Sequence, residues 1–289
     1  MRYFHVLRIA MRNWFLLGIL CWSYIGQAQV FYRRSEFGIA LGASNYYGDL
    51  NSNYGFQGVH ASGGLFYKYN FSRYIALKMA GNYAHVGYKD KYSTNYFQQQ
   101  RNLDFQNNIY EASVGAEFSF FQYKLQDFEH RFTPYVTIGI GMFWYNPYTI
   151  YEGKRYDLRP LGTEGQKYEE YKNRRYTNHA FSFPIGAGFK YWMTKGITLS
   201  FEVVNRSTTT DYIDDVSTTY VGIDKFNDIE PSPYPSVSSV LQDRSGELTT
   251  TPIGVKGRQR GISTTNDKFM MMQIGLSFRI PTYKCPDNF

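Results

Sequence analysis

Residues 110–119 read YEASVGAEFS, an order in which large or apolar side chains alternate with small or charged ones. In an extended chain Tyr110 and Phe118 fall on one face, whereas Glu111 and Glu117 fall on the opposite face. A period of two residues is the pattern of a β-strand, because successive side chains of a strand point to opposite sides. The segment therefore predicts a strand with one apolar face and one polar face.

Seven further stretches show the same alternation. Together the eight predicted strands cover about residues 36–46, 58–71, 75–84, 108–120, 132–145, 181–191, 197–206 and 270–280. Eight is an even number, as the strand count of a closed single-chain bacterial barrel must be. A ten-stranded barrel is the alternative, with additional strands between residues 216 and 221 and between residues 248 and 255.

The segments between these strands alternate in length along the chain. Long segments follow the odd-numbered strands, namely residues 47–57, 87–107, 146–179 and 207–267. Shorter segments follow the even-numbered strands, namely residues 72–73, 122–131 and 193–196. Outer-membrane barrels have short periplasmic turns and longer extracellular loops. With both chain ends in the periplasm, the predicted strands reproduce that arrangement.

The large side chains decide which face of the strands meets lipid. A soluble barrel of lipocalin type would point its apolar face inward, but an eight-stranded barrel has an interior only just wide enough for side chains to fill. The apolar faces carry too many large side chains to fit there. Tyr and Trp also gather near predicted strand ends, where membrane interfaces lie. These residues are Tyr46, Tyr67, Tyr69, Tyr83, Tyr145, Tyr191 and Trp192. The prediction is an all-β fold, an eight-stranded antiparallel transmembrane β-barrel with long extracellular loops.

The composition agrees with strands rather than with membrane helices. Aromatic residues make up 19% of the chain and hydrophobic residues 43%, while the mean hydropathy is −0.45. After the N-terminus no apolar run approaches the roughly 20 residues that a membrane-spanning helix needs.

The N-terminal segment has the layout of a secretory signal peptide. Three arginines precede or border an apolar stretch at residues 14–22, and Gly26 and Ala28 offer small side chains where a signal peptidase reads the chain. We expect cleavage after Ala28, which divides the chain into a signal peptide of residues 1–28 and an outer-membrane β-barrel domain of residues 29–289. An uncleaved membrane anchor is the alternative, although the apolar stretch is short for one.

Cleavage would change the charge and the cysteine content. Residues 1–28 hold three arginines and no acidic residue, so the formal net charge would fall from +7 to +4. Neither this charge nor any run of Lys and Arg resembles a nucleic-acid-binding surface. Cys285 would be the one cysteine left, so an intrachain disulfide would be impossible. Strand pairing and burial would have to hold the fold together.

The small-residue faces carry charged side chains that are predicted to line the barrel interior. These are Glu36, Lys68, Lys78, Glu111, Glu117, Lys190, Glu202, Arg206 and Arg279, five cations and four anions. An unpaired charge in a confined lumen would be costly, so we expect a network of internal salt bridges that plugs the barrel. A proton or ion path is the alternative, but a narrow barrel filled with paired side chains does not conduct.

No segment carries the motif of a known enzyme class. Outer-membrane hydrolases need a nucleophile, a histidine and an orienting acid near a rim, and the predicted topology places His60, His85 and Asp49 near the outer rim. There is, however, no Gly-x-Ser-x-Gly and no His-Glu-x-x-His sequence. We expect a protein that is not an enzyme, without catalytic residues and without a small-molecule substrate.

Asp211, Asp214 and Asp215 form an acidic cluster that offers oxygen ligands for calcium. The cluster lacks the glycine turn and the regular ligand spacing of an EF-hand loop. No metal site and no cofactor is therefore predicted, and calcium binding by this cluster is the weaker alternative.

Two segments carry information beyond their composition. Tyr46-Tyr47-Gly48-Asp49-Leu50-Asn51 closes the first predicted strand, and residues 210–220, TDYIDDVSTTY, follow the seventh. The second segment contains Asp211, Tyr212, Asp214 and Asp215. In these motifs, and in its layout over most of residues 29–289, the chain resembles the PorG-like family of outer-membrane barrels from Bacteroidetes.

The resemblance implies a component of the type IX secretion system, in which such a barrel ties a periplasmic ring of the lipoprotein PorK and its partner PorN to the outer membrane. It implies no catalytic residues. Its expected partners are outer-membrane lipids and ring proteins of PorK and PorN type. A ring beneath the membrane would first meet the turn at residues 121–131 and the tail at residues 281–289. The side chains expected at that contact are Lys124, Asp127, Phe128, Glu129, Arg131 and Cys285.

Overall fold

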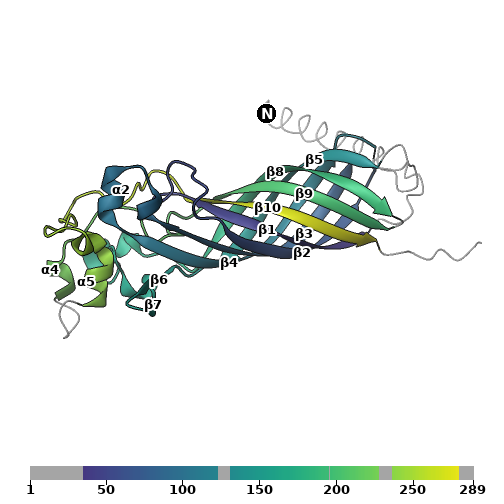
Figure 1. Cartoon of the computed structure of the whole chain (residues 1–289). Coiled ribbons are helices and arrows are strands. Elements are labelled where there is room, and N and C mark those ends of the chain that lie inside the picture. Colours follow the sequence, from purple (N-terminus) through teal and green to yellow (C-terminus); the bar gives the residue numbers. More distant parts are fainter. Residues whose placement is uncertain (1–34, 123–130, 195, 228–235, 280–289) are drawn as a thin grey trace, which may run out of the picture.

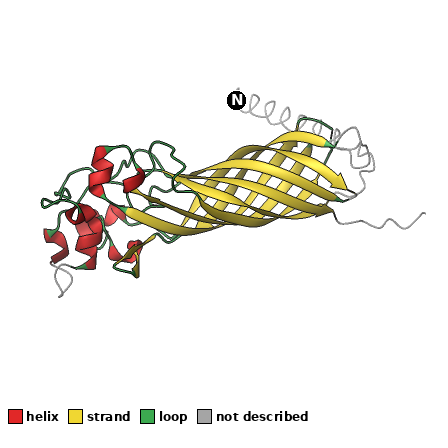
Figure 2. Cartoon of the chain, in the orientation of Figure 1, coloured by secondary structure: helices red, strands yellow, loops and turns green. Residues whose placement is uncertain are grey.

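The computed structural model describes residues 35–122, 131–194, 196–227 and 236–279. The long strands of this part of the chain form a barrel, and its short helices gather at one end of that barrel as a cap (Figure 1 and Figure 2). No helix in these ranges is both long and apolar enough to cross a membrane. The predicted signal peptide lies outside them.

Eight strands form the barrel wall. They are β1 (Ser35–Tyr47), β2 (His60–Asn70), β3 (Ile75–Lys89), β4 (Asp104–Ser119), β5 (Phe132–Trp144), β8 (His179–Thr194), β9 (Ile197–Thr208) and β10 (Lys268–Arg279). Each wall strand pairs antiparallel with the wall strands before and after it, and β1 pairs with β10 to close the ring. The predicted eight-stranded antiparallel barrel is confirmed. Outside the wall, β6 (Tyr148–Tyr151) and β7 (Lys154–Asp157) form a hairpin that joins the end of β4.

The ten-stranded alternative is wrong, because the segments proposed as extra strands contain no strand in the described chain. In the described chain an isolated β-bridge joins Thr219 to Gln259, which lies outside the second proposed segment. The backbone N–H groups of Ser217 and Thr218 donate to the carboxylate of Glu164 at 2.9 and 3.2 Å. These donors are therefore satisfied by a side chain rather than by a neighbouring strand.

The connections alternate in length as predicted. At one end of the barrel, residues 71–74 join β2 to β3 and residues 195–196 join β8 to β9. Residues 120–131 join β4 to β5 at the same end. At the other end the connections comprise residues 48–59, 90–103, 145–178 and 209–267, and in chain order each of the first three is longer than the connection that follows it. Because outer-membrane barrels keep short turns in the periplasm, this arrangement places the cap outside the cell.

The outward face of the wall is apolar and uncovered. Leu41 is 68% exposed, Leu65 66% and Ile138 60%. A monomer surrounded by water rarely exposes a contiguous apolar surface of this extent, whereas a lipid-facing barrel wall requires one. The wall therefore spans a membrane.

An aromatic row marks the cap end of this apolar wall. Tyr83 lies opposite Tyr110, and Tyr110 lies opposite Trp144, as in the belt of a membrane interface. Some side chains that the sequence assigned to such belts are instead buried, namely Tyr46, Tyr145 and Trp192. Tyr46 and Tyr145 belong to the core beneath the cap, because the cap covers the barrel mouth at which they lie.

The cap stands on strands that continue past the membrane. Pairing of β3 with β4 extends as far as Lys89 and Asp104. The short helices of the cap are η2 (Asp90–Tyr92), α2 (Tyr96–Arg101), α3 (Leu158–Leu161), η3 (Glu169–Arg174), α4 (Asp224–Asn227), α5 (Val237–Gln242) and η4 (Arg244–Glu247). Phe105, Phe143 and Phe269 are fully buried in the hydrophobic core that joins cap and barrel mouth. The upper lumen is thus filled with apolar side chains, although the sequence predicted only polar ones.

Candidate functional site

Glu117 is the central acid of the barrel lumen. Its carboxylate lies 2.6 Å from Lys68 Nζ and 2.7 Å from Lys190 Nζ. The Glu117 side chain is completely buried, and both lysines are less than one-tenth exposed. One carboxylate thus holds two cations in a space from which water is largely excluded.

The other predicted lumen charges are also paired. The pairs are Lys78 with Glu202 at 2.6 Å, Arg206 with Glu111 at 2.9 Å and Arg279 with Glu36 at 3.0 Å. Neutral groups satisfy further oxygens, since Tyr135 Oη donates to Glu202 at 2.9 Å and Ser182 Oγ donates to Glu111 at 2.6 Å. Every side chain that the sequence assigned to the lumen therefore lies there and belongs to an ion pair.

Aromatic rings occupy the space between these pairs. Lys68 Nζ lies 5.2 Å from the ring centres of both Phe66 and Tyr135. A cavity beside Lys78 and Arg206 measures about 30 Å³, which leaves room for about one or two water molecules. Along the described strands the lumen is therefore plugged by paired charges, and towards the mouth by the apolar core.

The segments 46–51 and 210–220, far apart in the sequence, meet directly above the lumen. Tyr46 Oη, at the end of β1, lies 2.6 Å from Asp214 Oδ2 and 2.8 Å from Asp267 Oδ1. Asn107 Nδ2 on β4 donates to the carbonyl oxygen of Ile213 at 2.7 Å. These contacts attach both ends of the long connection between β9 and β10 to the barrel mouth.

Gly48 occupies a position of the first motif at which no side chain fits. A Cβ atom on this residue would lie 1.9 Å from Asp267 Oδ1 and 2.0 Å from Tyr46 Oη. Any larger residue would therefore displace the hydrogen-bonded group at the centre of the cap. The neighbouring motif residues contribute packing, because Leu50 is buried in the cap core and the Tyr47 ring lies 4.8 Å from that of Tyr54.

Arg260 connects the second motif to a different loop. Its Nη1 lies 3.0 Å from Glu164 Oε1 and donates to the carbonyl oxygen of Asp215 at 2.6 Å, and its Nε donates to the Gln242 carbonyl oxygen at 3.1 Å. The Asp215 carboxylate accepts a hydrogen bond from Tyr176 Oη at 2.5 Å. One buried guanidinium thereby joins three segments of the extracellular cap.

A second buried arginine joins the remaining loops. Arg101, at the end of α2, donates through Nε and Nη2 to both oxygens of Asp90, each at 2.7 Å. Its Nη1 donates to the carbonyl oxygen of Arg260 at 2.5 Å. Asp49 of the first motif accepts a hydrogen bond from the Ile262 backbone N–H at 3.0 Å. The four long connections are therefore cross-linked by polar contacts into one unit.

The acids of this cap titrate abnormally because they are buried close to one another. Burial raises the pKa of Asp49 and of Asp215 to about 6, and that of Asp211 to about 8. Burial and repulsion by neighbouring carboxylates raise the pKa of Asp214 and of Asp267 well above the ordinary value. The folded cap thus holds protons that an unfolded chain would release at neutral pH.

The hydrogen bonds of Tyr46 also indicate that a carboxyl group of the cap is protonated. Its hydroxyl carries one hydrogen and lies within bonding distance of both Asp214 and Asp267. It can donate to only one of them, so the other acid must carry a proton and donate to the phenol oxygen. The geometry therefore requires one protonated carboxyl group in this set of three side chains.

The replacement Asp267→Asn is expected to weaken the pH dependence of cap stability. In the wild type the folded cap binds a proton that unfolded aspartate loses near pH 3.9. This stabilisation is fully present below that pH and is lost as the pH rises through the folded pKa, by about 1.4 kcal/mol per pH unit for one proton. An asparagine can accept from Ile213 N–H, as Asp267 Oδ2 does at 2.8 Å, and donate to Tyr46 without a titrating proton. Hydrogen exchange of cap amides between pH 5 and 9 would measure the slope.

The exposed acid Asp224 provides the matched control, because Asp224→Asn removes a cap carboxylate without touching this cluster. Its slope should equal that of the wild type. An Asp267→Asn variant with the wild-type slope would show that the shared proton does not lie on these residues.

The acidic cluster and the histidines have separate contacts in the structure. The described residues contain no group of three or more His, Cys, Asp or Glu side chains arranged to hold a metal ion. Asp214 and Asp215 face different partners, and Asp49 is held by backbone rather than by a histidine. His60 and His85 stack edge to face with ring centres 4.6 Å apart. The weaker calcium alternative finds no support in this geometry.

Most of the predicted partner contacts lie outside the described residues, namely Lys124, Asp127, Phe128, Glu129 and Cys285. Arg131 is described, and its guanidinium lies 5.8 Å from the centre of the Trp192 ring. The same end of the barrel presents Phe120 and Phe121, which are 52% and 55% exposed.

Sequence reasoning missed the residues that hold the cap together, namely Asp90, Arg101, Glu164, Arg260 and Asp267. They lie in long connections that show no period of two or of 3.6, so nothing local indicates their burial. The one available signal was the position of Asp267 directly before the last strand.

An apolar outer wall, a lumen of paired charges and a cap over one mouth define a transmembrane β-barrel of the outer-membrane type. Within that class, the chain belongs to a family described as a domain of unknown function, DUF6089, which matches residues 11–227. No curated protein matches the chain.

Three solved structures of small outer-membrane barrels are similar to the chain at low identity. The N-terminal β-barrel domain of Pseudomonas aeruginosa OprF is 11% identical, with 86% of this chain and 100% of that chain covered and a TM-score of 0.36. Neisserial surface protein A is 10% identical, with 85% and 97% covered and a TM-score of 0.41. Ail, the attachment invasion locus protein of Yersinia pestis, is 11% identical, with 86% and 100% covered and a TM-score of 0.38. The eight-stranded barrel itself rests on the strand pairing of this chain.

Proposed function

We propose that this barrel is a non-enzymatic anchor in the outer membrane, and that it holds a periplasmic ring of PorK and PorN type in a type IX secretion system. The observation that carries the first part is the filled lumen. Glu117 with its two lysines, and the apolar core beneath the cap, occupy the path that a solute would take. What remains available for function is the surface of the protein. The secretion system and the ring come from the resemblance of the two motifs.

The contacts of the motifs support their use as markers of the resemblance. Tyr46, Gly48 and Asp214 take part in one buried hydrogen-bonded group, so they are structural residues of the cap rather than isolated coincidences of sequence. A hydrolase is the less favoured reading, because the rim histidines and Asp49 are engaged separately. Passage of solutes is disfavoured by the plugged lumen.

The proposal is tested at the periplasmic end. Replacing residues 122–131 by a short Asn-Gly connection and deleting residues 281–289 should leave the barrel inserted, because neither segment supplies a described wall strand. Ring proteins should no longer co-purify with the barrel from native outer membranes, and secretion should fail. Heat-modifiability on gels reports whether the barrel has folded.

Substitution on the other end provides the control. Lys172→Ala and Lys256→Ala remove exposed cap charges and should leave ring recovery unchanged. If a folded barrel without its periplasmic segments still retains the ring and supports secretion, the periplasmic anchor is disproved.

An adhesin-like role of the cap is the second candidate. A cavity of about 830 Å³ lies among α4, α5, η4 and residues 252–256, on the extracellular side. Its volume falls within the roughly 300 to 1,000 Å³ of small-molecule sites. Loss of ring recovery in the periplasmic variant would argue against this role as the main function, whereas a wild-type barrel that recovers no ring proteins would favour it.

A further inference from the structure

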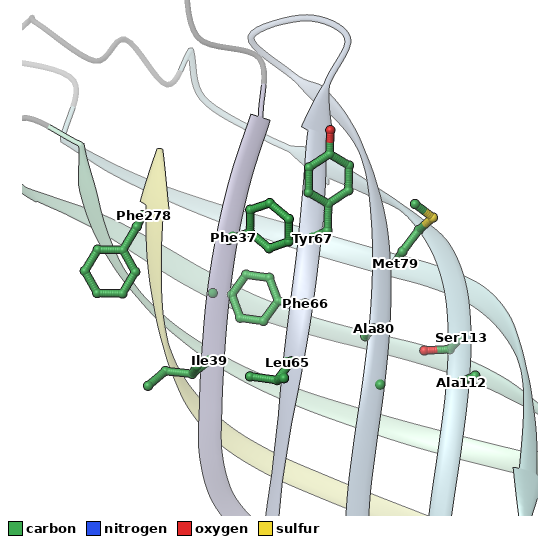
Figure 3. A pocket seen from close by; sticks show the side chains of 12 residues that line it. Phe37, Ile39, Leu65, Phe66, Tyr67, Met79, Ala80, Ala112, Ser113 and Phe278 are labelled. Carbon is green, nitrogen blue, oxygen red and sulfur yellow. The ribbon is translucent and has the colours of Figure 1, made fainter. Parts of the chain in front are cut away.

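A groove of about 590 Å³ crosses the outer wall of the barrel near its periplasmic end (Figure 3). One side of the groove is a row of large side chains on adjacent strands. Phe278 lies opposite Phe37, Phe37 opposite Tyr67, and Tyr67 opposite Met79. This row forms a continuous ridge from β10 to β3.

The other side of the groove is formed two residues further along each strand. Ile39 lies opposite Leu65, Leu65 opposite Gly81, and Gly81 opposite Ala112. The large side chains of this second row therefore end at Leu65, and the small residues Gly81 and Ala112 that follow leave the floor of the groove open. A Cβ atom added to Gly81 would meet no atom within 4 Å. The hollow exists because side chains are small there, and the strands beneath it remain fully paired.

The groove is part of the wall that faces lipid hydrocarbon. Phe37 and Leu65 at its sides are 54% and 66% exposed. Other outward-facing residues of the membrane-spanning wall are exposed as well. The surface is thus continuous with the interface between protein and lipid, so its occupant must be apolar and must come from the membrane. We propose that the groove binds one acyl chain of a phospholipid of the periplasmic leaflet.

The dimensions of the groove fit a single chain. It reaches from β10 to β4 across four strand spacings of about 4.8 Å, which gives a length of roughly 19 Å. The hydrocarbon core of a bilayer is about 30 Å thick, so the chains of one leaflet extend over about 15 Å. The ridge on one side and Ile39 and Leu65 on the other limit the sideways motion of a chain, which a smooth wall would not do.

Polar groups lie on the periplasmic side of the groove, where the lipid headgroup would lie. Tyr67 Oη is 2.9 Å from Ser35 Oγ, and in Figure 3 the Tyr67 hydroxyl points towards the turn between β2 and β3. That turn carries Arg73, a cation at the periplasmic end of the wall. Tyrosine at the interface and arginine beside it are the groups that recognise glycerol and phosphate oxygens.

Attraction in this site comes from contact rather than from release of water. Lipid chains and apolar side chains are alike, so no hydrophobic driving force separates bound from free lipid. A chain lying in the groove touches side chains on two flanks as well as the floor, and these dispersion contacts add. A larger side chain on the floor of the groove should therefore release the acyl chain without unfolding the barrel.

The test uses the full-length barrel in nanodiscs that contain only phosphatidylethanolamine and phosphatidylglycerol, with native mass spectrometry as the readout. The wild type should retain one phospholipid under conditions that strip the remaining lipid. Gly81→Leu should reduce that retention about tenfold, which corresponds to about 1.4 kcal/mol. The matched control is Ala187→Leu, since Ala187 is an exposed outward-facing alanine on β8, and it should behave as the wild type.

Two results would overturn the proposal. One is a wild-type barrel that retains no phospholipid, and the other is equal retention by the wild type, Gly81→Leu and Ala187→Leu. Heat-modifiability confirms that each variant is folded. Should Gly81→Leu fold poorly, Ala112→Leu fills the same floor from β4 and must give the same loss.

Discussion

Glu117→Ala is expected to lower the free energy of unfolding of the barrel by at least about 3 to 5 kcal/mol, the range measured when one partner of a buried ion pair is removed. Glu117 is completely buried and holds both Lys68 and Lys190. Its loss would leave two buried cations without their carboxylate. The midpoint of urea unfolding in liposomes, read by heat-modifiability on gels, measures the change.

Two controls separate charge from packing. Leu77→Ala removes a side chain from the lipid-facing wall and should cost less, because a lipid chain can fill the gap. Glu117→Leu combined with Lys68→Met and Lys190→Met removes all three charges while keeping similar volume, and should recover most of the stability.

Equal sensitivity at Glu117 and Leu77, or greater sensitivity at Leu77, would contradict the assignment of the two faces. Failure of the uncharged triple variant to recover would show that packing around Tyr135, rather than charge, explains the loss.

Arg260→Ala is expected to destabilise the cap by a similar amount, about 3 to 5 kcal/mol. The guanidinium is buried, pairs with Glu164 and donates to the carbonyl oxygens of Asp215 and Gln242. Without it Glu164 becomes a buried carboxylate whose cation is missing, and two carbonyl groups lose a donor. Limited proteolysis of the inserted protein should then cleave the cap many times faster, while the membrane wall stays intact.

Arg258 offers a matched control two positions away. Its side chain is exposed and lies over the Phe97 ring at 5.4 Å, so Arg258→Ala should leave the cleavage rate close to that of the wild type. Equal rates in both variants would show that the cap does not depend on the buried guanidinium. Loss of the whole barrel in Arg260→Ala would show that cap and wall unfold together.

Alternation along the chain sufficed to predict the wall of this protein. In residues 110–119 it places Glu111 and Glu117 in the lumen and Tyr110 and Phe118 on the outside, and the structure does the same. The inference works because a strand turns successive side chains to opposite sides whatever its neighbours are. The lengths of the connections likewise follow from the chain alone.

The pairing of the charged side chains inside the barrel could not be predicted from the sequence. Lys68, on β2, meets Glu117, on β4, although the residue directly opposite Glu117 on β3 is Ala76. Which charges meet across the lumen depends on the tilt and stagger of the closed sheet, and these are properties of the whole ring.

The cap depended still more on tertiary structure. Tyr46 and Asp267 are 221 positions apart, yet they share a hydrogen bond at the centre of the cap. A barrel, its strand count and its two faces could be predicted from the amino-acid sequence, because they follow from local periodicity. Only the folded chain decided that the long connections close over the mouth, because buried polar groups in loops find their partners through space and leave no periodic trace in the sequence.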